Sequence, residues 1–248
     1  MGTQKILTQD QIAAFYHDDF VKSQVEDFIL LFGSSVNSTL VKIVDIGGGC
    51  GFFAKALGER MNLKVRVLDS DIQSINLCEQ KGIVADYGDA LKPNIIGDES
   101  IVCFNLILHH IISTSAYQTL KMQGDVLSVW QSTVSAIFIN EYIYESYIFK
   151  NISGWLIYQI TSNSFLSNLG RFVAKFVPSL QANTFGVGVR FRSHTEWRRI
   201  FESLGFEVVD TKKGPEEDVS LARRLLLIKS CRRDSFLLKP VKLNTKVA

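Results

Sequence analysis

A glycine-rich turn between a β-rich run and an amphipathic segment constrains the fold of this chain more than any other feature. Residues 41–46 form a short apolar run typical of a strand, and residues 52–61 have the apolar spacing of a helix. Between them lies the sequence Asp45-Ile46-Gly47-Gly48-Gly49-Cys50-Gly51. Glycines at such a junction let the backbone turn sharply and approach a ligand, with helical N–H groups pointing at it. The pattern therefore indicates an α/β fold with a ligand at this turn.

The alternation of strand and helix continues along the chain. Further strands are predicted at 64–68, 83–85, 101–108 and 136–140, and further helices at 72–81 and 116–130. This order predicts a parallel sheet with helices on both faces. A helix at 195–204 then precedes strands at 206–211 and 221–230, joined by a polar hairpin loop. The last pair of strands is therefore expected to be antiparallel.

With 248 residues, the chain is long enough for one large domain with an insertion. Residues 146–190 form that predicted insertion, because they are rich in aromatics and too long for a simple connection. The expected parts are an N-terminal helical cap (1–40), a ligand-binding core (41–145), the insertion (146–190), the rest of the core sheet (191–232) and a basic tail (233–248).

Charge is distributed unevenly. Residues 221–248 hold eight Lys or Arg against one acid, Asp234, and the stretch between Glu145 and Glu196 contains no Asp or Glu at all. That stretch can face an anion. The four cysteines form no CxxC pair, so we expect buried thiols and no metal site. No secretion signal or membrane-spanning segment is recognisable, which predicts a cytoplasmic protein.

The acid before the glycines distinguishes between ligands. A pyrophosphate at this turn would be repelled by the carboxylate of Asp45, two residues before Gly47, whereas a ligand with an ammonium group would be held by it. A dinucleotide-binding GxGxxG pattern is also absent, because Phe52 and Ala54 occupy the positions that would need glycine. The ligand is therefore expected to carry a positive charge.

These residues resemble the first motif of the class I S-adenosylmethionine-dependent methyltransferases, an acid followed by GxGxG. Asp69, in Val67-Leu68-Asp69-Ser70, resembles their second motif, whose acid binds the ribose, and Gly88-Asp89-Ala90 resembles their third, whose acid binds the adenine amino group. Asn105 stands in the fourth motif, where many members have Asp. The resemblance covers most of residues 41–230. The residues it implies for the cofactor are Asp45, Gly47, Gly48, Gly49, Gly51, Asp69, Ser70, Asp89, Ala90 and Asn105.

The resemblance implies a Rossmann-like, doubly wound, seven-stranded sheet that is mostly parallel, with an antiparallel last strand, N-terminal helices and a helical lid. S-adenosylmethionine would be the cofactor and S-adenosylhomocysteine the product. Asp71 competes with Asp69 for the ribose, but its position before Ile72 favours a helix cap.

Three residues are candidates for catalysis. Methyl transfer to a hydroxyl requires alignment of the acceptor and a group that accepts a proton. His109 and His110 follow a central strand, at the edge where open α/β sheets bind ligands. Glu141 follows the next strand and could bind the acceptor or assist His110. The alternatives are a structural histidine and a solvated loop acid.

The insertion is predicted to contact the molecule that accepts the methyl group. Residues 146–190 occupy the place of a substrate lid in these enzymes, although a helical subdomain, a dimer interface or a membrane-surface element are alternatives. Arg190 and Arg192 could grip an anionic group, and His194 could bind substrate or be an exposed residue in the first turn of a helix.

The predicted function is methyl transfer to a small molecule, with a hydroxyl oxygen as the preferred acceptor. RNA methylation, suggested by the basic tail, and a catalytically inactive partner protein with this fold remain alternatives. No RNA-binding module is recognisable, so nucleic acid is not the expected partner, and a homodimer stays open.

Overall fold

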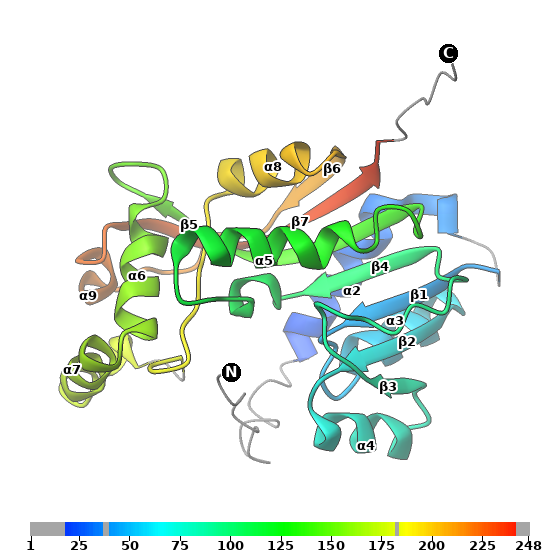
Figure 1. The fold of residues 1–248 in the computed structure, drawn as a ribbon, viewed down its shortest axis with the longest axis horizontal. Coiled ribbons are helices and arrows are strands. Elements are labelled where there is room, and N and C mark those ends of the chain that lie inside the picture. Colours follow the sequence, from blue (N-terminus) through cyan, green and yellow to red (C-terminus); the bar gives the residue numbers. More distant parts are fainter. Residues whose placement is uncertain (1–17, 37–39, 182–183, 242–248) are drawn as a thin grey trace.

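A computed structural model describes residues 18–36, 40–181 and 184–241 (Figure 1). Its strands are β1 (Lys42–Ile46), β2 (Lys64–Asp69), β3 (Ala85–Tyr87), β4 (Ile101–Asn105), β5 (Ala136–Ser146), β6 (Phe206–Lys213) and β7 (Ile228–Pro240). Its α-helices are α2 (Asp18–Phe32), α3 (Phe52–Met61), α4 (Ile72–Gln80), α5 (Ala116–Ser128), α6 (Ile152–Ser162), α7 (Ser164–Ala174), α8 (His194–Ser203) and α9 (Leu221–Arg224). Short 3₁₀ turns are η1 (Gly33–Val36), η2 (Leu108–His110) and η3 (Pro178–Leu180).

All seven strands belong to one sheet, in the order β3-β2-β1-β4-β5-β7-β6. The strands from β3 to β5 are parallel, whereas β7 runs antiparallel to both of its neighbours. The strand order reverses between β1 and β4, and in open α/β sheets ligands bind beyond the carboxyl ends of the strands at such a point. The predicted Rossmann-like sheet with an antiparallel last strand is confirmed.

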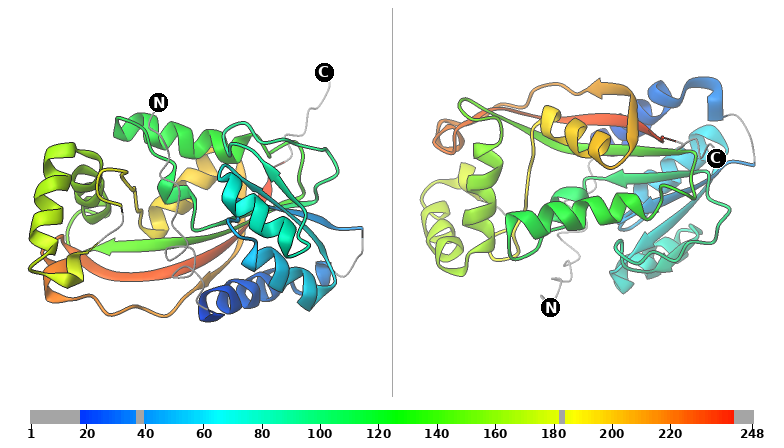
Figure 2. Two further views of the ribbon diagram at one scale, coloured as in Figure 1. Left: turned by 90° about the horizontal axis from the view of Figure 1, so that it is seen from below. Right: turned by 45° about the horizontal axis from the view of Figure 1, so that its top comes forward.

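Helices cover both faces of the sheet (Figures 1 and 2). On one face α5 and α8 bury Trp130, Trp197 and Phe201 against the central strands. On the other, α2 and α3 bury an aromatic cluster that includes Phe28 and Phe53. These two cores fix the strand ends where the candidate site lies.

The predicted insertion is helical. Residues 146–190 contain α6, α7 and η3, which lie together at the end of the molecule where β5 and β7 project (Figures 1 and 2). The small helix α9 lies at the same end and contacts η3.

The sequence-based boundaries are wrong at the carboxyl end. The predicted strand 221–230 is the helix α9 followed by the start of β7, and the predicted basic tail, 233–248, begins inside β7. Three consecutive charges at 232–234 hid the strand periodicity, yet Arg232 and Asp234 are buried and paired with each other across 2.9 Å. The part of the tail beyond Val241 lies outside the described residues, as do residues 1–17 of the predicted cap.

Two smaller observations complete the fold. All four cysteines are buried and free, as predicted. Among the described residues no helix has both the length and the apolar character needed to cross a bilayer.

Candidate functional site

The glycine turn follows β1 and leads into α3. Gly47, Gly49 and Gly51 all have positive φ, which side-chain-bearing residues rarely adopt. A Cβ atom on Gly47 would lie 2.1 Å from the Ile107 side chain, whereas nothing lies within 4 Å of the position where Gly49 would carry one. The turn is therefore packed against the segment between β4 and η2 on one side and open at Gly49, where a ligand can reach the backbone.

Asp45 lies beneath this turn and has no exposed surface. Asn105, at the end of β4, donates from its amide nitrogen to Oδ1 of Asp45 across 3.0 Å. Burial, reinforced by the nearby Asp69 and opposed by the Asn105 hydrogen bond, raises the pKa of Asp45 from 3.8 to about 7. Among the described residues, Oδ2 of Asp45 and Oδ1 of Asn105 have no hydrogen-bond partner. These two oxygens can accept hydrogen bonds from a cationic ligand.

Asp69 ends β2 and is held against the same turn. Its Oδ2 accepts from the backbone N–H of Gly49 at 2.8 Å, and its Oδ1 accepts from that of Asp71, also at 2.8 Å. Burial is the main cause that raises the pKa of Asp69. Asp71 caps α4 by accepting from Gln73 and Ser74, as predicted. Asp69 is therefore the acid fixed at the glycine turn, and Ser70 follows it there.

The third predicted acid lies further out. Asp89 is exposed, and its Oδ1 accepts from the backbone N–H of Leu91 at 2.9 Å. Ala90 packs against the central core. Both lie in the loop after β3, next to β2 in the sheet, so they share the strand edge that carries Asp69.

The two candidate histidines form part of η2, directly after β4. Glu141 has no exposed surface; its Oε1 accepts from the backbone N–H of Leu108 at 2.6 Å, and its Oε2 lies 2.7 Å from Nδ1 of His109. A carboxylate only accepts, so Nδ1 of His109 carries the hydrogen of this bond. Glu141 therefore holds His109 and the backbone of η2 rather than His110, and it is not the solvated loop acid of the alternative interpretation.

His110 is the accessible member of the pair, with its ring centroid 4.2 Å from that of His109. The protein that surrounds part of the ring desolvates it, and the adjacent His109 adds to the effect, so the pKa of His110 falls below its ordinary 6.5. The ring is then neutral at physiological pH and has a lone pair that can accept a hydrogen bond, while its lowered pKa makes it a weak base. Leu106, the first residue after β4, has a backbone φ of 55°, which is a strained conformation for leucine.

Arg190 and Arg192, predicted to grip an anionic substrate, have internal partners instead. Arg192 is buried and donates to Oε1 of Gln123 from Nε at 2.9 Å and from Nη2 at 2.7 Å, and Arg190 lies 3.7 Å from Glu196. The amide of Gln123 donates in turn to the carbonyl of Leu108. Arg192 therefore supports η2 through Gln123, whereas the Arg190 side chain pairs with Glu196.

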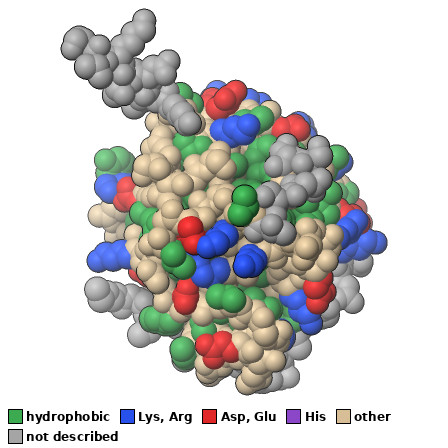
Figure 3. Space-filling model, turned by 90° about the vertical axis from the view of Figure 1, so that its right-hand side faces the viewer, with side chains coloured by type: hydrophobic (Ala, Val, Ile, Leu, Met, Phe, Trp, Pro, Cys, Tyr) green, Lys and Arg blue, Asp and Glu red, His purple; other side chains and the backbone are tan. Residues whose placement is uncertain are grey.

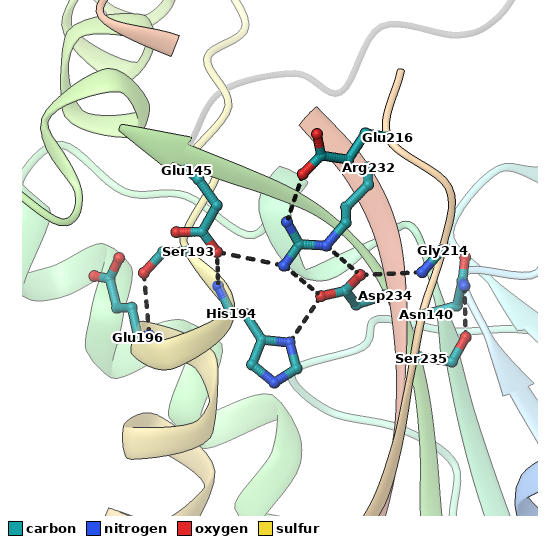
Figure 4. Close-up of polar contacts among 10 residues, drawn as sticks. All are labelled: Asn140, Glu145, Ser193, His194, Glu196, Gly214, Glu216, Arg232, Asp234 and Ser235. Carbon is teal, nitrogen blue, oxygen red and sulfur yellow. Dashed lines mark hydrogen bonds and ion pairs between the residues drawn. The ribbon is translucent and has the colours of Figure 1, made fainter. Parts of the chain in front are cut away.

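His194 is buried at the start of α8, where the sequence allowed an exposed or substrate-binding residue (Figure 4). Its Nδ1 lies 2.7 Å from Oδ2 of Asp234. Arg232 also donates one hydrogen bond to each oxygen of the Asp234 carboxylate. Glu145 approaches Arg232 at 3.5 Å and accepts from the backbone N–H of His194. Residue spacing gave no signal for this cluster, because its members come from β5, α8 and β7.

No known family model matches this chain, and no curated protein matches it by sequence. Solved structures match over most of its length. An S-adenosylmethionine-dependent methyltransferase from Clostridium acetobutylicum superposes with a TM-score of 0.57 at 12% identity, covering 94% of this chain and 98% of that one. Magnesium protoporphyrin IX methyltransferase from Synechocystis, solved with bound SAH, gives 0.52 at 13% identity, with 96% and 90% covered.

Geranyl diphosphate C-methyltransferase from Streptomyces coelicolor, solved with Mg²⁺, geranyl diphosphate and S-adenosyl-L-homocysteine, gives a TM-score of 0.55 at 9% identity, covering 89% of this chain and 77% of that one. At these identities the likeness establishes the fold. This chain therefore has the fold of the class I S-adenosylmethionine-dependent methyltransferases.

Proposed function

We propose that this protein is an S-adenosylmethionine-dependent methyltransferase that acts on a small molecule, with a hydroxyl oxygen as acceptor. The observation that carries the proposal is the buried Asp45, whose Oδ2 lacks a partner among the described residues beneath a glycine turn that is open at Gly49. A buried carboxylate with a raised pKa is stabilised by a ligand that brings positive charge.

The chain's own residues provide the binding groups. Asp45 and Asn105 would offer acceptors for the ammonium group, and the carboxylate of Asp69, already oriented by two backbone N–H groups, would accept from the ribose hydroxyls. Asp89 and Ala90, in the loop after β3, are assigned to the adenine. When bound, the cofactor supplies a methyl group on a sulfonium that is open to in-line attack.

His110 is proposed to accept a hydrogen bond from the acceptor hydroxyl and to take its proton as the oxygen–methyl bond forms, because the ring is accessible and neutral and the oxygen becomes acidic enough for a weak base at that stage. His109 is proposed as a positioning residue: Glu141 fixes its ring, and its own carbonyl accepts from the backbone N–H of Arg190 at 2.9 Å. This bond ties the end of the insertion to η2. The segment 146–190 is proposed to close over the acceptor and select it.

Two observations bear on the acceptor. The matched structures named for their substrates act on magnesium protoporphyrin IX and geranyl diphosphate, both small molecules. The basic residues that suggested RNA are partly engaged inside the protein: Arg232 pairs with Asp234, and Arg223 donates to the Tyr144 hydroxyl at 2.7 Å. A small-molecule acceptor is the better-supported choice.

The test is a calorimetric titration with S-adenosylhomocysteine, with NADH as the control ligand. We expect the homocysteine compound alone to bind, and Asp69→Ala to weaken its binding at least tenfold without changing the far-UV circular dichroism spectrum. Binding of NADH, or unchanged affinity in Asp69→Ala, would contradict the assignment.

The catalytic role of His110 needs a second readout. Incubation with tritiated S-adenosylmethionine and a fractionated small-molecule extract should label a product, and His110→Gln should lower the rate while leaving the affinity for S-adenosylhomocysteine unchanged. An equal rate in the variant would remove His110 from the reaction.

A further inference from the structure

Helix α7 turns its apolar side outward. Phe165, Leu169, Phe172, Val173 and Phe176, the last just beyond the end of the helix, are all exposed, and Phe165 and Phe176 keep 75% and 73% of their surface accessible. At 100° per residue these five positions share a sector of about 100° of the helix. A surface helix of a globular protein ordinarily turns such a stripe toward the core.

The opposite side of α7 is built from small residues. Ser167 and Ala174 are buried, and the Ser167 hydroxyl donates to the carbonyl of Ile160 in α6 at 2.7 Å. A Cβ atom on Gly170 would lie 2.5 Å from the ring of Phe185. Rotation of the aromatic side inward would bring large side chains against α6 and Phe185, where only small residues now fit. The exposed stripe is thus a fixed property of the packing.

Other exposed apolar side chains occur on neighbouring elements. α6, α7 and α9 lie at one end of the molecule, and the loop after β5 joins α9 through the backbone bond from Tyr147 to Leu227 (Figures 1 and 2). The exposed apolar residues there are Tyr147, Ile148, Phe149, Trp155, Leu221 and Leu225. The opposite end of the molecule, in Figure 3, shows acidic and basic side chains intermixed.

The charge at this end has one dominant sign. The chain contains no Asp or Glu between Glu145 and Glu196, while this segment exposes Lys150 in the loop before α6 and Lys175 directly after α7. The acids nearest in sequence to α9 are residues 216–218, and Glu216 lies within 4.0 Å of Arg232. An apolar stripe in a segment that carries cations and no acids is complementary to a surface that is apolar inside and negatively charged outside.

We propose that α7 and the loop 147–150, which lie at the two ends of α6, form a membrane-binding face that lies on anionic lipid. The phenylalanines would enter the headgroup boundary, and Lys150 and Lys175 would contact lipid phosphates. A second copy of this chain is a poorer occupant, because a two-fold interface through α7 would place these cations near their own copies. The proposal is independent of the proposed methyl transfer.

Flotation of the full chain with vesicles tests the proposal. We expect binding to vesicles of 70% phosphatidylcholine and 30% phosphatidylglycerol, weak binding to phosphatidylcholine alone, and loss of binding in high salt. Phe165→Ser/Phe172→Ser/Phe176→Ser should lower the partition coefficient at least tenfold. The matched control Ile72→Ser/Val84→Ser/Tyr117→Ser removes exposed apolar residues elsewhere and should bind like the unmodified protein.

The charges are tested separately. Each cation near an anionic surface contributes about fivefold to binding, so Lys150→Gln/Lys175→Gln should lower the partition coefficient about 25-fold. The control variant Lys55→Gln/Lys64→Gln, which removes two lysines elsewhere, should leave it unchanged. Unchanged circular dichroism spectra and unfolding midpoints establish that the variants are folded. The proposal is overturned if the anionic vesicles do not bind the protein, or if the phenylalanine variant floats equally well. A dimer that dissociates in that variant, without vesicle binding, would instead assign the face to a second copy.

Discussion

Asp45 is expected to destabilise the ligand-free protein at neutral and alkaline pH. Its pKa rises from 3.8 to about 7 on folding because the carboxylate is fully buried. The folded state therefore binds more protons than the unfolded state between pH 4 and pH 7, and stability falls as the pH rises through this window. Above pH 7 the full cost applies, at about 4 kcal/mol.

Replacement of Asp45 by Asn removes this cost and keeps a similar shape. The difference in the free energy of unfolding between Asp45→Asn and the unmodified protein should grow by up to about 4 kcal/mol from pH 4 to pH 8, in favour of the variant. Urea denaturation without ligand measures this difference. Asp98→Asn, which removes a half-exposed carboxylate beside Lys42, serves as the control and should show no such rise.

Ligand binding supplies a second measurement on the same group. A cation beside Asp45 lowers its pKa, so S-adenosylhomocysteine should release about 0.9 proton per site at pH 6, detectable by calorimetry in buffers of different ionisation enthalpy. Asp45→Asn should bind more weakly and release none. The reasoning is refuted if the variant gains no stability at pH 8 and the unmodified protein releases no proton at pH 6.

Three further predictions concern other parts of the molecule. Asp234→Asn weakens the hydrogen bonds and ion pairs of buried Arg232 and His194, so the free energy of unfolding should fall by about 3–5 kcal/mol, measured with urea. Gly154→Ala places a Cβ atom 2.1 Å from the carbonyl oxygen of Phe191 and should lower the free energy of unfolding by about 1–3 kcal/mol, measured by thermal unfolding. The control Gly58→Ala, in α3, should lower it less. The ring of His110 should remain neutral on acidification to pH 5.5, so its Cε1–H signal in NMR should not shift between pH 8 and pH 5.5; a midpoint near 6.5 would contradict its lowered pKa.

The sheet and the cofactor-side acids could be predicted because their signals are local. Asp45, the glycines and Asp69 lie at fixed offsets from strands whose apolar runs are easily recognised, and strand ends in a parallel sheet meet at one edge. The roles of Glu141 and Arg192 could not be predicted, since their partners lie 32 and 69 residues away in the chain. The predicted strand ends at residue 140, whereas β5 continues to Ser146 and places Glu141 inside the sheet, where it holds a buried histidine.

The charges inside β7 have a related explanation. Glu141 of β5 and Asp234 of β7 are directly opposite in the antiparallel register, and neither has exposed surface. Opposite residues in such a pair project from the same face of the sheet, so two unpaired carboxylates there would repel each other. Each has its own donors: His109 and a backbone N–H for Glu141, and Arg232, His194 and the Gly214 N–H for Asp234. Arg232, directly before the predicted basic tail, therefore supplies the charge that allows Asp234 to be buried inside β7.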